Sequence, residues 1–314
     1  MREIVALNEI WLNDDQRARL AALGNLRLHE EIPATRDELL ARVAPADIVL
    51  LSEVHLDRAA LQSASRLKLV SLWSAGFDTV DIQAARELGI TVCHAPGCSA
   101  TKIAEHTLAV AIYFIHRLSE ADRHVRHGGF RWEPFNTPEL RGQTFGIVGF
   151  GRIGARVAQY ANALGCRVMA HTRHPSPARA AGLKVEFVEL ETLLEQGDVI
   201  SINVALTPET AGMIGPREFE RMRRRPILVN TARGPILDQA ALLAALRSGQ
   251  IRAAALDVLQ DEPPAAGEPL LALDNVLLSP RSAGASIQTF ECLSELCVQN
   301  VEAYLAGKPQ HVLT

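Results

Sequence analysis

Three glycines, Gly149, Gly151 and Gly154, constrain the fold of this chain more than any other feature. They follow an apolar run, TFGIVGF, that predicts a buried strand, and they open a stretch, ARVAQYANAL, that predicts a helix. A G-x-G-x-x-G spacing at such a turn is typical of dinucleotide sites, because it permits a tight turn and close approach to a pyrophosphate. Arg152 and Ile153 complete the turn, where helix N–H groups would face the phosphates.

The end of the next predicted strand bears on which dinucleotide binds. NAD sites usually have Asp or Glu there, which accepts hydrogen bonds from the ribose 2′-OH. This chain has Thr172 and Arg173 instead, between His171 and His174. Thr and Arg suit a 2′-phosphate through charge-assisted hydrogen bonds, so we expect NADP to be preferred, with NAD possible. In the alternative, Arg173 is a solvated loop residue that does not select between them.

Short apolar runs alternate with helical patterns along most of the chain. Strands interleaved with helices in this way are typical of βαβ units and parallel sheets. The predicted strands are 4–7, 48–52, 67–73 and 90–95 in a first series, and 144–150, 166–171, 199–204, 226–230, 253–258 and 275–279 in a second. The pattern predicts an α/β protein with two domains, a dinucleotide-binding domain (101–285) inserted into a substrate-binding domain (1–100 plus 286–314).

Composition excludes several classes of function. The 314 residues carry a net charge of −4, which argues against nucleic-acid binding, and no apolar stretch reaches the roughly 18 residues of a membrane span. The N-terminal residues lack the apolar core of a signal peptide. The five cysteines are an odd number without a metal-like C-x-x-C pair, so we expect no metal site, five reduced thiols and a cytoplasmic protein.

Charged residues follow three strands of the second series. Arg233 follows PILVN, Asp257 ends AAALD with Glu262 five residues on, and Arg281 follows NVLLSP. Ligands of open α/β sheets bind at the carboxyl ends of strands. One such residue alone would indicate a structural ion pair, but four at one edge beside a dinucleotide turn predict a functional site.

Seven motifs together make the chain similar to the D-isomer-specific 2-hydroxyacid dehydrogenase family, nearly from end to end. They are SAGFDTVD (74–81), APGCSATKIAEHTLA (95–109), GIVGFGRIG (146–154), LTPETAGMIG (206–215), VNTARGPILD (229–238), AALDVLQDEPP (254–264) and LSPRSAG (278–284). The resemblance implies a flavodoxin-like substrate domain around a Rossmann domain, usually a homodimer, that reduces a small 2-keto acid to a D-2-hydroxy acid. Glyoxylate and hydroxypyruvate are the substrates it suggests for an NADP-dependent member.

The resemblance also implies roles for individual residues. Arg233 matches the arginine that binds the substrate carboxylate and C2 oxygen, for which a planar bidentate donor is suited. Ala75 and Gly76 match the loop whose backbone N–H groups hold the same carboxylate. Glu262 matches the acid that hydrogen-bonds to the catalytic base. The positions implied to contact the cofactor, besides those named above, are Val204, Thr210, Thr231, Ala232 and Asp257.

Arg281 departs from the family pattern, because the family has its general acid–base histidine at this position. A histidine can give and take a proton near neutrality, whereas an arginine essentially cannot. General acid–base catalysis is worth about 10²–10⁴-fold, so this change would weaken turnover without abolishing hydride transfer.

Four interpretations of Arg281 remain open. It can stabilise the alkoxide electrostatically while water supplies the proton, which would favour reduction over oxidation. It can bind a second anionic group of a dicarboxylate or phosphorylated substrate. Another histidine, His94 or His106, can carry the proton. Finally, the chain can be a cofactor-sensing regulatory protein that has lost catalysis. The otherwise complete site favours an active reductase over that last alternative.

Overall fold

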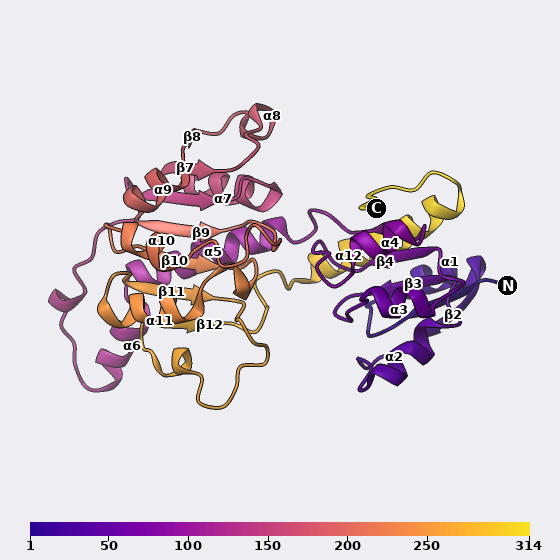
Figure 1. The fold of residues 1–314 in the computed structure, drawn as a ribbon. Helices are drawn as coiled ribbons and strands as arrows, with labels where there is room; N and C mark the ends of the chain where they lie inside the picture. The colour runs from indigo at the N-terminus through magenta and orange to yellow at the C-terminus, as the bar shows by residue number, and fades with distance from the viewer. The chain divides into compact units, whose positions relative to one another are not determined.

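The computed structural model describes residues 1–314, and the chain divides into two compact units. Unit 1 comprises Met1–Cys98 and Ser286–Thr314, and unit 2 comprises Ser99–Ala285. Unit 2 is therefore inserted into unit 1. The chain crosses from one unit to the other twice, after Cys98 and before Ser286 (Figure 1).

Unit 1 is built on a parallel sheet of five strands in the order β2-β1-β3-β4-β5, which is the order of the flavodoxin-like fold that the family resemblance implied. Its strands are β1 (Glu3–Ala6), β2 (Asn25–Leu28), β3 (Ile48–Leu51), β4 (Leu69–Leu72) and β5 (Thr91–Cys93). Its helices are α1 (Asp14–Leu23), α2 (Arg36–Val43), α3 (Arg58–Ser63), α4 (Ile82–Glu87) and α12 (Ile287–Leu305).

Both faces of this sheet are covered, which explains why its strands are apolar at successive positions. Val5 of β1 packs in a core with residues of α2, α3 and α4. Its neighbours Ile4 and Ala6 face the other way, into a core with residues of α1 and α12. The C-terminal helix thus completes unit 1. Within this sheet, β2 is the strand that the apolar runs did not reveal, because its residues are half-buried or exposed.

Unit 2 has a parallel sheet of seven strands in the order β12-β11-β10-β9-β6-β7-β8, which confirms the predicted Rossmann topology. Its strands are β6 (Thr144–Val148), β7 (Arg167–His171), β8 (Val185–Phe187), β9 (Val199–Ile202), β10 (Ile227–Asn230), β11 (Ala253–Leu256) and β12 (Val276–Leu278). Its α-helices are α5 (Ala100–Ile115), α6 (Leu118–Arg126), α7 (Arg152–Ala163), α8 (Pro177–Ala180), α9 (Leu190–Gln196), α10 (Pro216–Arg221) and α11 (Gln239–Ser248). Single 3₁₀ turns are η1 (Glu133–Phe135), η2 (Gly234–Ile236) and η3 (Pro269–Ala272).

Two apolar layers sandwich the sheet of unit 2. One core contains α5 and α7 residues with Phe145 and Ile147 of β6. The other contains α9, α10 and α11 residues with Val148 of β6 and Leu228 of β10. Because every strand of the sheet is parallel, the carboxyl ends of all seven meet at one edge (Figure 1).

Polar contacts fix α12 to the rest of unit 1. Trp73 Nε1 donates a hydrogen bond of 2.9 Å to Ser294 Oγ, and Ser71 Oγ donates one of 3.0 Å to the Cys297 carbonyl. Arg19 of α1 binds both Glu295 and Glu302, at 2.9 and 2.7 Å. These contacts hold a helix that lies far from its neighbours in sequence.

Glu295→Gln is expected to destabilise the protein by about 1 kcal/mol at pH 7, because the ion pair with Arg19 is partly exposed. The hydrogen bond from Arg19 lowers the pKa of Glu295 to about 2, from 4.5. The stabilisation is therefore complete above about pH 4.5 and is lost as the pH falls through about 2. Urea unfolding should show a smaller difference from wild type at pH 3 than at pH 7. Glu291→Gln, an exposed change on the same helix, is the control, and an equal difference at both pH values would contradict this account.

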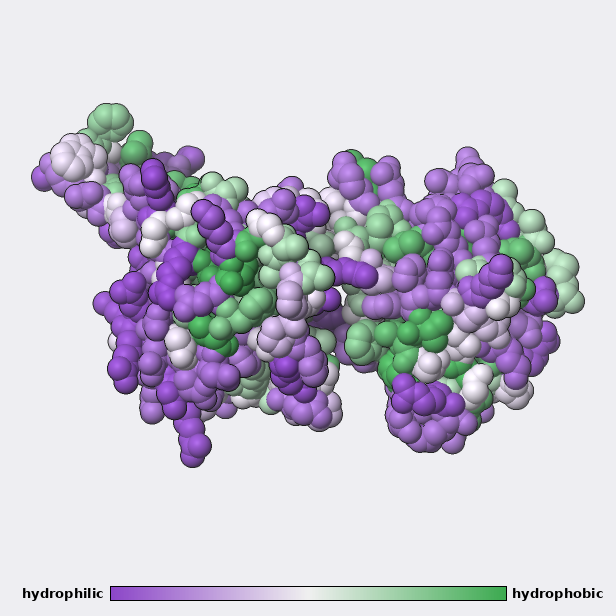
Figure 2. Space-filling view, turned by 90° about the horizontal axis from the view of Figure 1, so that it is seen from above, coloured by the Kyte–Doolittle hydropathy of each residue, from purple (hydrophilic) through white to green (hydrophobic).

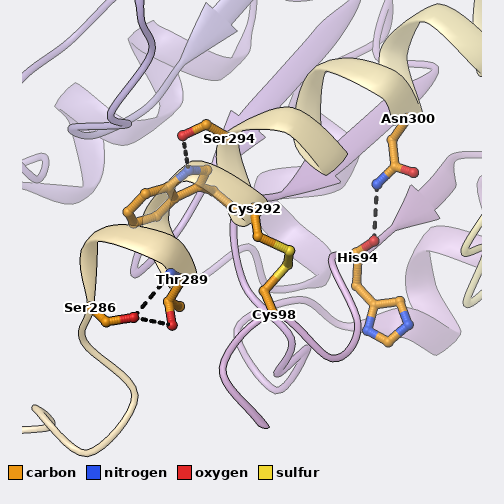
Figure 3. The surroundings of a disulfide bond; sticks show 8 residues. His94, Cys98, Ser286, Thr289, Cys292, Ser294 and Asn300 are labelled. Atoms are coloured by element: carbon orange, nitrogen blue, oxygen red, sulfur yellow. Dashed lines mark hydrogen bonds between the residues drawn. A yellow bond between two sulfur atoms is a disulfide. The ribbon is translucent and has the colours of Figure 1, made fainter. Parts of the chain in front are cut away.

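Two of the five cysteines are paired, so the expectation of five free thiols is wrong. Cys98 and Cys292 form a disulfide with Cα atoms 5.6 Å apart, across 194 residues of sequence (Figure 3). This pairing depends on the return of α12 to the loop after β5, which the spacing of the cysteines does not reveal. The other three thiols, Cys93, Cys166 and Cys297, are free and buried.

The surface mixes polar and apolar side chains. On the face shown in Figure 2, hydrophobic patches on each unit are interrupted by hydrophilic residues. None of the helices is both long enough and apolar enough to span a membrane.

Candidate active site

The glycine turn lies at the carboxyl end of β6, between β9 and β7 in the sheet. Gly149 has φ of 97°, and a Cβ there would lie 2.8 Å from the Asn203 backbone. A Cβ on Gly154 would lie 2.2 Å from the Gly149 carbonyl oxygen. These two glycines are required by the turn itself. Gly151 is different, because a Cβ there would meet nothing within 4 Å.

The open side of Gly151 fits a pyrophosphate. Gly151 is the N-cap of α7 and gives no side-chain hydrogen bond to the helix, so the N–H groups of the first turn, from Arg152 and Ile153 onward, have no side-chain cap. Such N–H groups, with the helix dipole, form an anion site. Asn203, just after β9, has a buried Oδ1 without a hydrogen-bond partner. No sequence motif pointed to Asn203. An unpartnered acceptor beside Gly149 suits a polar ligand there.

The end of β7 carries the residues predicted to select the cofactor. Thr172 is half-buried, and Arg173 and His174 are exposed. Hydrogen bonds from Thr207 and the backbone lower the pKa of the Glu209 carboxyl. Arg173 is close enough to add a smaller electrostatic contribution in the same direction. Arg179 of α8 was not predicted. Its Nη1 donates a hydrogen bond of 2.9 Å to the Phe150 carbonyl, which ties the segment after β7 to the glycine turn.

Arg233 lies in a loop that is shaped by Asn230, the last residue of β10. The fully buried Asn230 amide donates to the Arg233 carbonyl at 2.9 Å and accepts from the Ala232 N–H at 3.0 Å. The Arg233 guanidinium donates to the Ala232 carbonyl at 2.7 Å. Asn230 could not be predicted from the sequence, because its role depends on hydrogen bonds within the loop.

Gly234 brings the Arg233 loop against the loop that carries Glu262. A Cβ on Gly234 would lie 1.9 Å from the Leu259 carbonyl oxygen, so only glycine fits. The Leu259 N–H donates in turn to Glu262 Oε1 at 2.8 Å. The carboxylate of Glu262 is thereby fixed, and its other oxygen accepts a hydrogen bond from Arg281 Nε.

Arg281 is held by its backbone as well as by Glu262. It has φ of 54°, in the left-handed region that is uncommon for residues other than glycine. Its N–H donates to the carbonyls of Asp257 and Ser279, at 3.0 and 3.1 Å. The two terminal nitrogens of its guanidinium make no hydrogen bond, so they remain available to a ligand.

Asp257 organises the turn around Arg281. Its buried carboxylate accepts hydrogen bonds from Ser279 Oγ (2.5 Å), the Ser282 N–H (2.9 Å) and the Ala283 N–H (3.0 Å). Burial raises the pKa of Asp257 in spite of these bonds. The predicted contact of Asp257 with a nicotinamide is a separate role that stays a prediction.

The two histidines named as alternative proton carriers lie in different units. His106 of α5 is in unit 2, where burial lowers its pKa and the Asp257 carboxylate opposes that effect. His94 is in unit 1, after β5, and its Nδ1 lies 2.9 Å from the Ala75 carbonyl. A carbonyl can only accept, so Nδ1 of His94 carries a proton and its neutral form presents Nε2 as an acceptor.

Ala75 and Gly76 follow β4 in unit 1. The Ala75 carbonyl pairs with His94, and the Gly76 carbonyl accepts a 2.7 Å hydrogen bond from Ser74 Oγ. Both carbonyls are therefore hydrogen-bonded within unit 1. The predicted use of the two N–H groups for a substrate carboxylate stays a prediction.

The remaining predicted cofactor residues lie on loops at the same edge of unit 2. Val204 contacts the glycine turn, since its Cγ1 would lie 2.8 Å from a Cβ on Gly149. Thr210 is buried, and its hydroxyl donates to the Ala205 carbonyl at 2.7 Å, so it shapes its own loop. Thr231 and Ala232 are half-buried in the Arg233 loop.

Comparison with known proteins agrees with this arrangement. The family profile of the D-isomer specific 2-hydroxyacid dehydrogenase NAD binding domain matches residues 108–283. A glyoxylate reductase of Korarchaeum cryptofilum is 38% identical over 284 residues, which cover 89% of this chain and 86% of that protein. A D-3-phosphoglycerate dehydrogenase of Archaeoglobus fulgidus is 40% identical over 88% of this chain, which spans only 52% of that relative's length.

A solved structure supports the same family assignment. An acyclic imino acid reductase in complex with NADPH and D-Arg has a TM-score of 0.92 and 26% identity, over 99% of this chain and 100% of that one. Sequence and fold therefore agree, and the chain belongs to the D-isomer-specific 2-hydroxyacid dehydrogenase family.

Proposed function

We propose that the protein reduces a small 2-keto acid to a D-2-hydroxy acid with NADPH. One observation carries the proposal. Unit 2 holds Arg233, Glu262, Asp257 and Arg281 at the edge of its sheet where the glycine turn also lies. A site for a keto acid requires Arg233 and Glu262 in fixed positions. A catalytically inactive protein of the same fold would not require them.

The residues divide the work as follows. The glycine turn of Gly149, Gly151 and Gly154 would hold a nicotinamide cofactor, which would supply the hydride for C2 of the keto acid. Arg233 binds the carboxylate and the C2 oxygen of the substrate. The terminal nitrogens of Arg281 stabilise the developing alkoxide, to which water gives the proton. Because no base is then present to deprotonate an alcohol, reduction is favoured over oxidation.

Glu262 limits what Arg281 can do. Its carboxylate offsets the charge of the guanidinium, which leaves hydrogen bonding to one oxyanion as the better-supported role. A full second anionic group on the substrate would compete with Glu262 for the same side chain. We therefore favour short keto acids such as glyoxylate and hydroxypyruvate over dicarboxylates.

NADPH is favoured over NADH because Thr172 and Arg173 take the place of an acidic residue at the end of β7. Arg179 adds a second guanidinium to that segment, anchored to the Phe150 carbonyl. A 2′-phosphate in this position would meet positive charge and no carboxylate from the strand end.

Arg173→Asp is expected to shift the ratio of kcat/KM for NADPH over NADH by about 10–10²-fold toward NADH, as the loss of one hydrogen bond to a charged group implies. The two rates are measured with one keto acid. Arg223→Asp makes the same charge change at a side chain that is 76% exposed and should leave the ratio alone. An unaltered ratio in Arg173→Asp would remove this residue from cofactor selection.

A spectrophotometric screen tests the proposed function. Glyoxylate, hydroxypyruvate, pyruvate, phenylpyruvate and oxaloacetate are each offered with NADPH and NADH, and cofactor binding is followed separately by fluorescence. We expect turnover of at least one short keto acid, fastest with NADPH. Binding of the cofactor with no turnover of any keto acid would favour the alternative, a dinucleotide-sensing regulatory protein.

Reduction of a 2-imino acid is a second candidate, favoured by the guanidinium at the proton-donor position. A protonated imine already carries its proton on nitrogen, so hydride transfer alone completes the reduction. The pairing of Arg281 with Glu262 reduces the repulsion that a cationic imine would meet. Methylamine added to pyruvate should then raise the rate of NADPH oxidation, and an unchanged rate would exclude this candidate.

A homodimer is also part of the proposal. The segment after α5 exposes large apolar side chains, among them Phe130 (91% exposed) and Trp132 (73% exposed). Such a cluster is unusual on a monomer and suits an interface with a second copy of the chain. Light scattering should give the mass of a dimer for the wild type and of a monomer for the double variant Phe130→Asp/Trp132→Asp. A monomeric wild type would refute the proposed homodimer.

A further inference from the structure

We propose that Cys98 and Cys292 are a reversible thiol–disulfide site that fastens together the two crossings between the units. Cys98 is the last residue of unit 1 before the first crossing, and Cys292 lies in the second turn of α12, shortly after the second crossing at Ser286. The bond thus joins the two places where the chain leaves and re-enters unit 1 (Figure 3).

The crossings are close to each other on both sides of the bond. Within unit 2, a Cβ on Gly284 would lie 3.3 Å from Ser99 Cβ and 3.6 Å from Ile103 Cγ1. Within unit 1, the Cys98–Cys292 bond joins the segment that leads into the first crossing to the helix that follows the second crossing. Two further contacts hold the first turn of α12. Ser286 Oγ caps the helix by accepting a hydrogen bond from the Thr289 N–H (Figure 3), and the ring centroid of Phe290 lies 5.3 Å from that of Trp73.

The paired cysteines are also the accessible ones. Cys98 and Cys292 are both half-buried, whereas the three unpaired cysteines are buried. Burial raises the pKa of Cys93 and of Cys166 to about 11, and that of Cys297 to about 12. Because the thiolate is the reactive form, these three are poor partners for exchange. Oxidation should therefore be confined to the Cys98–Cys292 pair.

The chemistry needs a small-molecule disulfide as the oxidant, for example glutathione disulfide. One cysteine thiolate attacks it, forming a mixed disulfide and releasing one glutathione thiolate. The second cysteine thiolate then displaces the second glutathione, so the pair loses two electrons and two protons and two glutathione thiols are formed. In the cytoplasm that the sequence predicts, an excess of reduced glutathione drives the same steps in reverse.

The state of the bond should control the mobility of the crossings. Hinges absorb motion through a few backbone dihedrals, and a covalent link between two adjacent hinge segments restricts both. We expect the oxidised protein to open more slowly at residues 97–103 and 284–290. In the reductase proposed above, oxidation should then lower kcat a few-fold and leave NADPH affinity unchanged, since the glycine turn is not involved.

The experiment compares the full chain after equilibration with glutathione disulfide or with dithiothreitol. Maleimide labelling of the unfolded protein should count three thiols in the oxidised sample and five in the reduced one. Hydrogen exchange should be slower at the two crossings only in the oxidised sample. Neither measurement requires a keto acid to be turned over, so a failed reductase assignment would not be confused with failure of this proposal.

Matched variants complete the design. Cys98→Ser and Cys292→Ser should each exchange like the reduced wild type under both conditions, and Cys166→Ser should respond to oxidation as the wild type does. Five thiols after oxidation, equal exchange at the crossings in both states, or a response that persists in Cys98→Ser would each overturn the proposal.

Discussion

Arg281→His is expected to raise kcat for the best keto acid by about 10²-fold, which is within the range attributed to general acid–base catalysis. The histidine would stand next to Glu262, whose carboxylate is already held by the Leu259 N–H and directed at residue 281. A carboxylate on one ring nitrogen favours the protonated imidazole and orients the other nitrogen toward the substrate oxygen. The variant should also acquire a bell-shaped dependence of rate on pH.

Steady-state kinetics between pH 5 and 10 measure both effects, and Arg281→Gln is the control, since it removes the charge without adding a titrating group. Two results would argue against the electrostatic role of Arg281. A rise in KM with little change in kcat would mean that Arg281 binds an anionic group of the substrate. An unchanged rate and pH profile would mean that His94, His106 or another residue carries the proton.

Arg233→Lys is expected to lower kcat/KM by about 10²-fold, because losing a charge-assisted pair of hydrogen bonds costs about 3 kcal/mol. Lysine keeps the charge but cannot reach the carboxylate and the C2 oxygen at once with a planar fork. The loop should persist, since Asn230 and Gly234 shape it through the backbone.

NADPH binding separates a local effect from a general one. Its dissociation constant should not change in Arg233→Lys, and Arg223→Lys, at a side chain that is 76% exposed, should match the wild type in every parameter. Wild-type kcat/KM in Arg233→Lys would show that this arginine does not bind the substrate.

The sequence predicted those features of the fold and site that depend on local residue patterns. Apolar runs located every strand except β2 and β8, whose residues are half-buried or exposed, and the glycine spacing located the turn at β6. Gly149 and Gly154 were recognisable because steric limits leave no other residue possible. Arg233, Glu262 and Arg281 were recognised through their motifs and through the rule that parallel strands end at one edge.

What the sequence did not reveal depends on distant contacts. Asn230 and Arg179 act through hydrogen bonds to backbone carbonyls, and the spacing of residues in the sequence does not predict such bonds. The Cys98–Cys292 bond spans 194 residues and requires α12 to return beside the loop after β5, so an odd count of scattered cysteines pointed to free thiols instead. The buried, unpartnered Asn203 Oδ1 is visible only in three dimensions.

The dependence of kcat on pH, measured for the wild-type protein with its best keto acid and saturating NADPH, tests the central claim most directly. If Arg281 stabilises the alkoxide and water gives the proton, turnover should be measurable and should show no ionisation between about pH 6 and 9, since no side chain in that role titrates there. A sigmoidal or bell-shaped profile with a midpoint near that of histidine would contradict the role of Arg281. Absence of turnover at every pH would contradict the reductase itself.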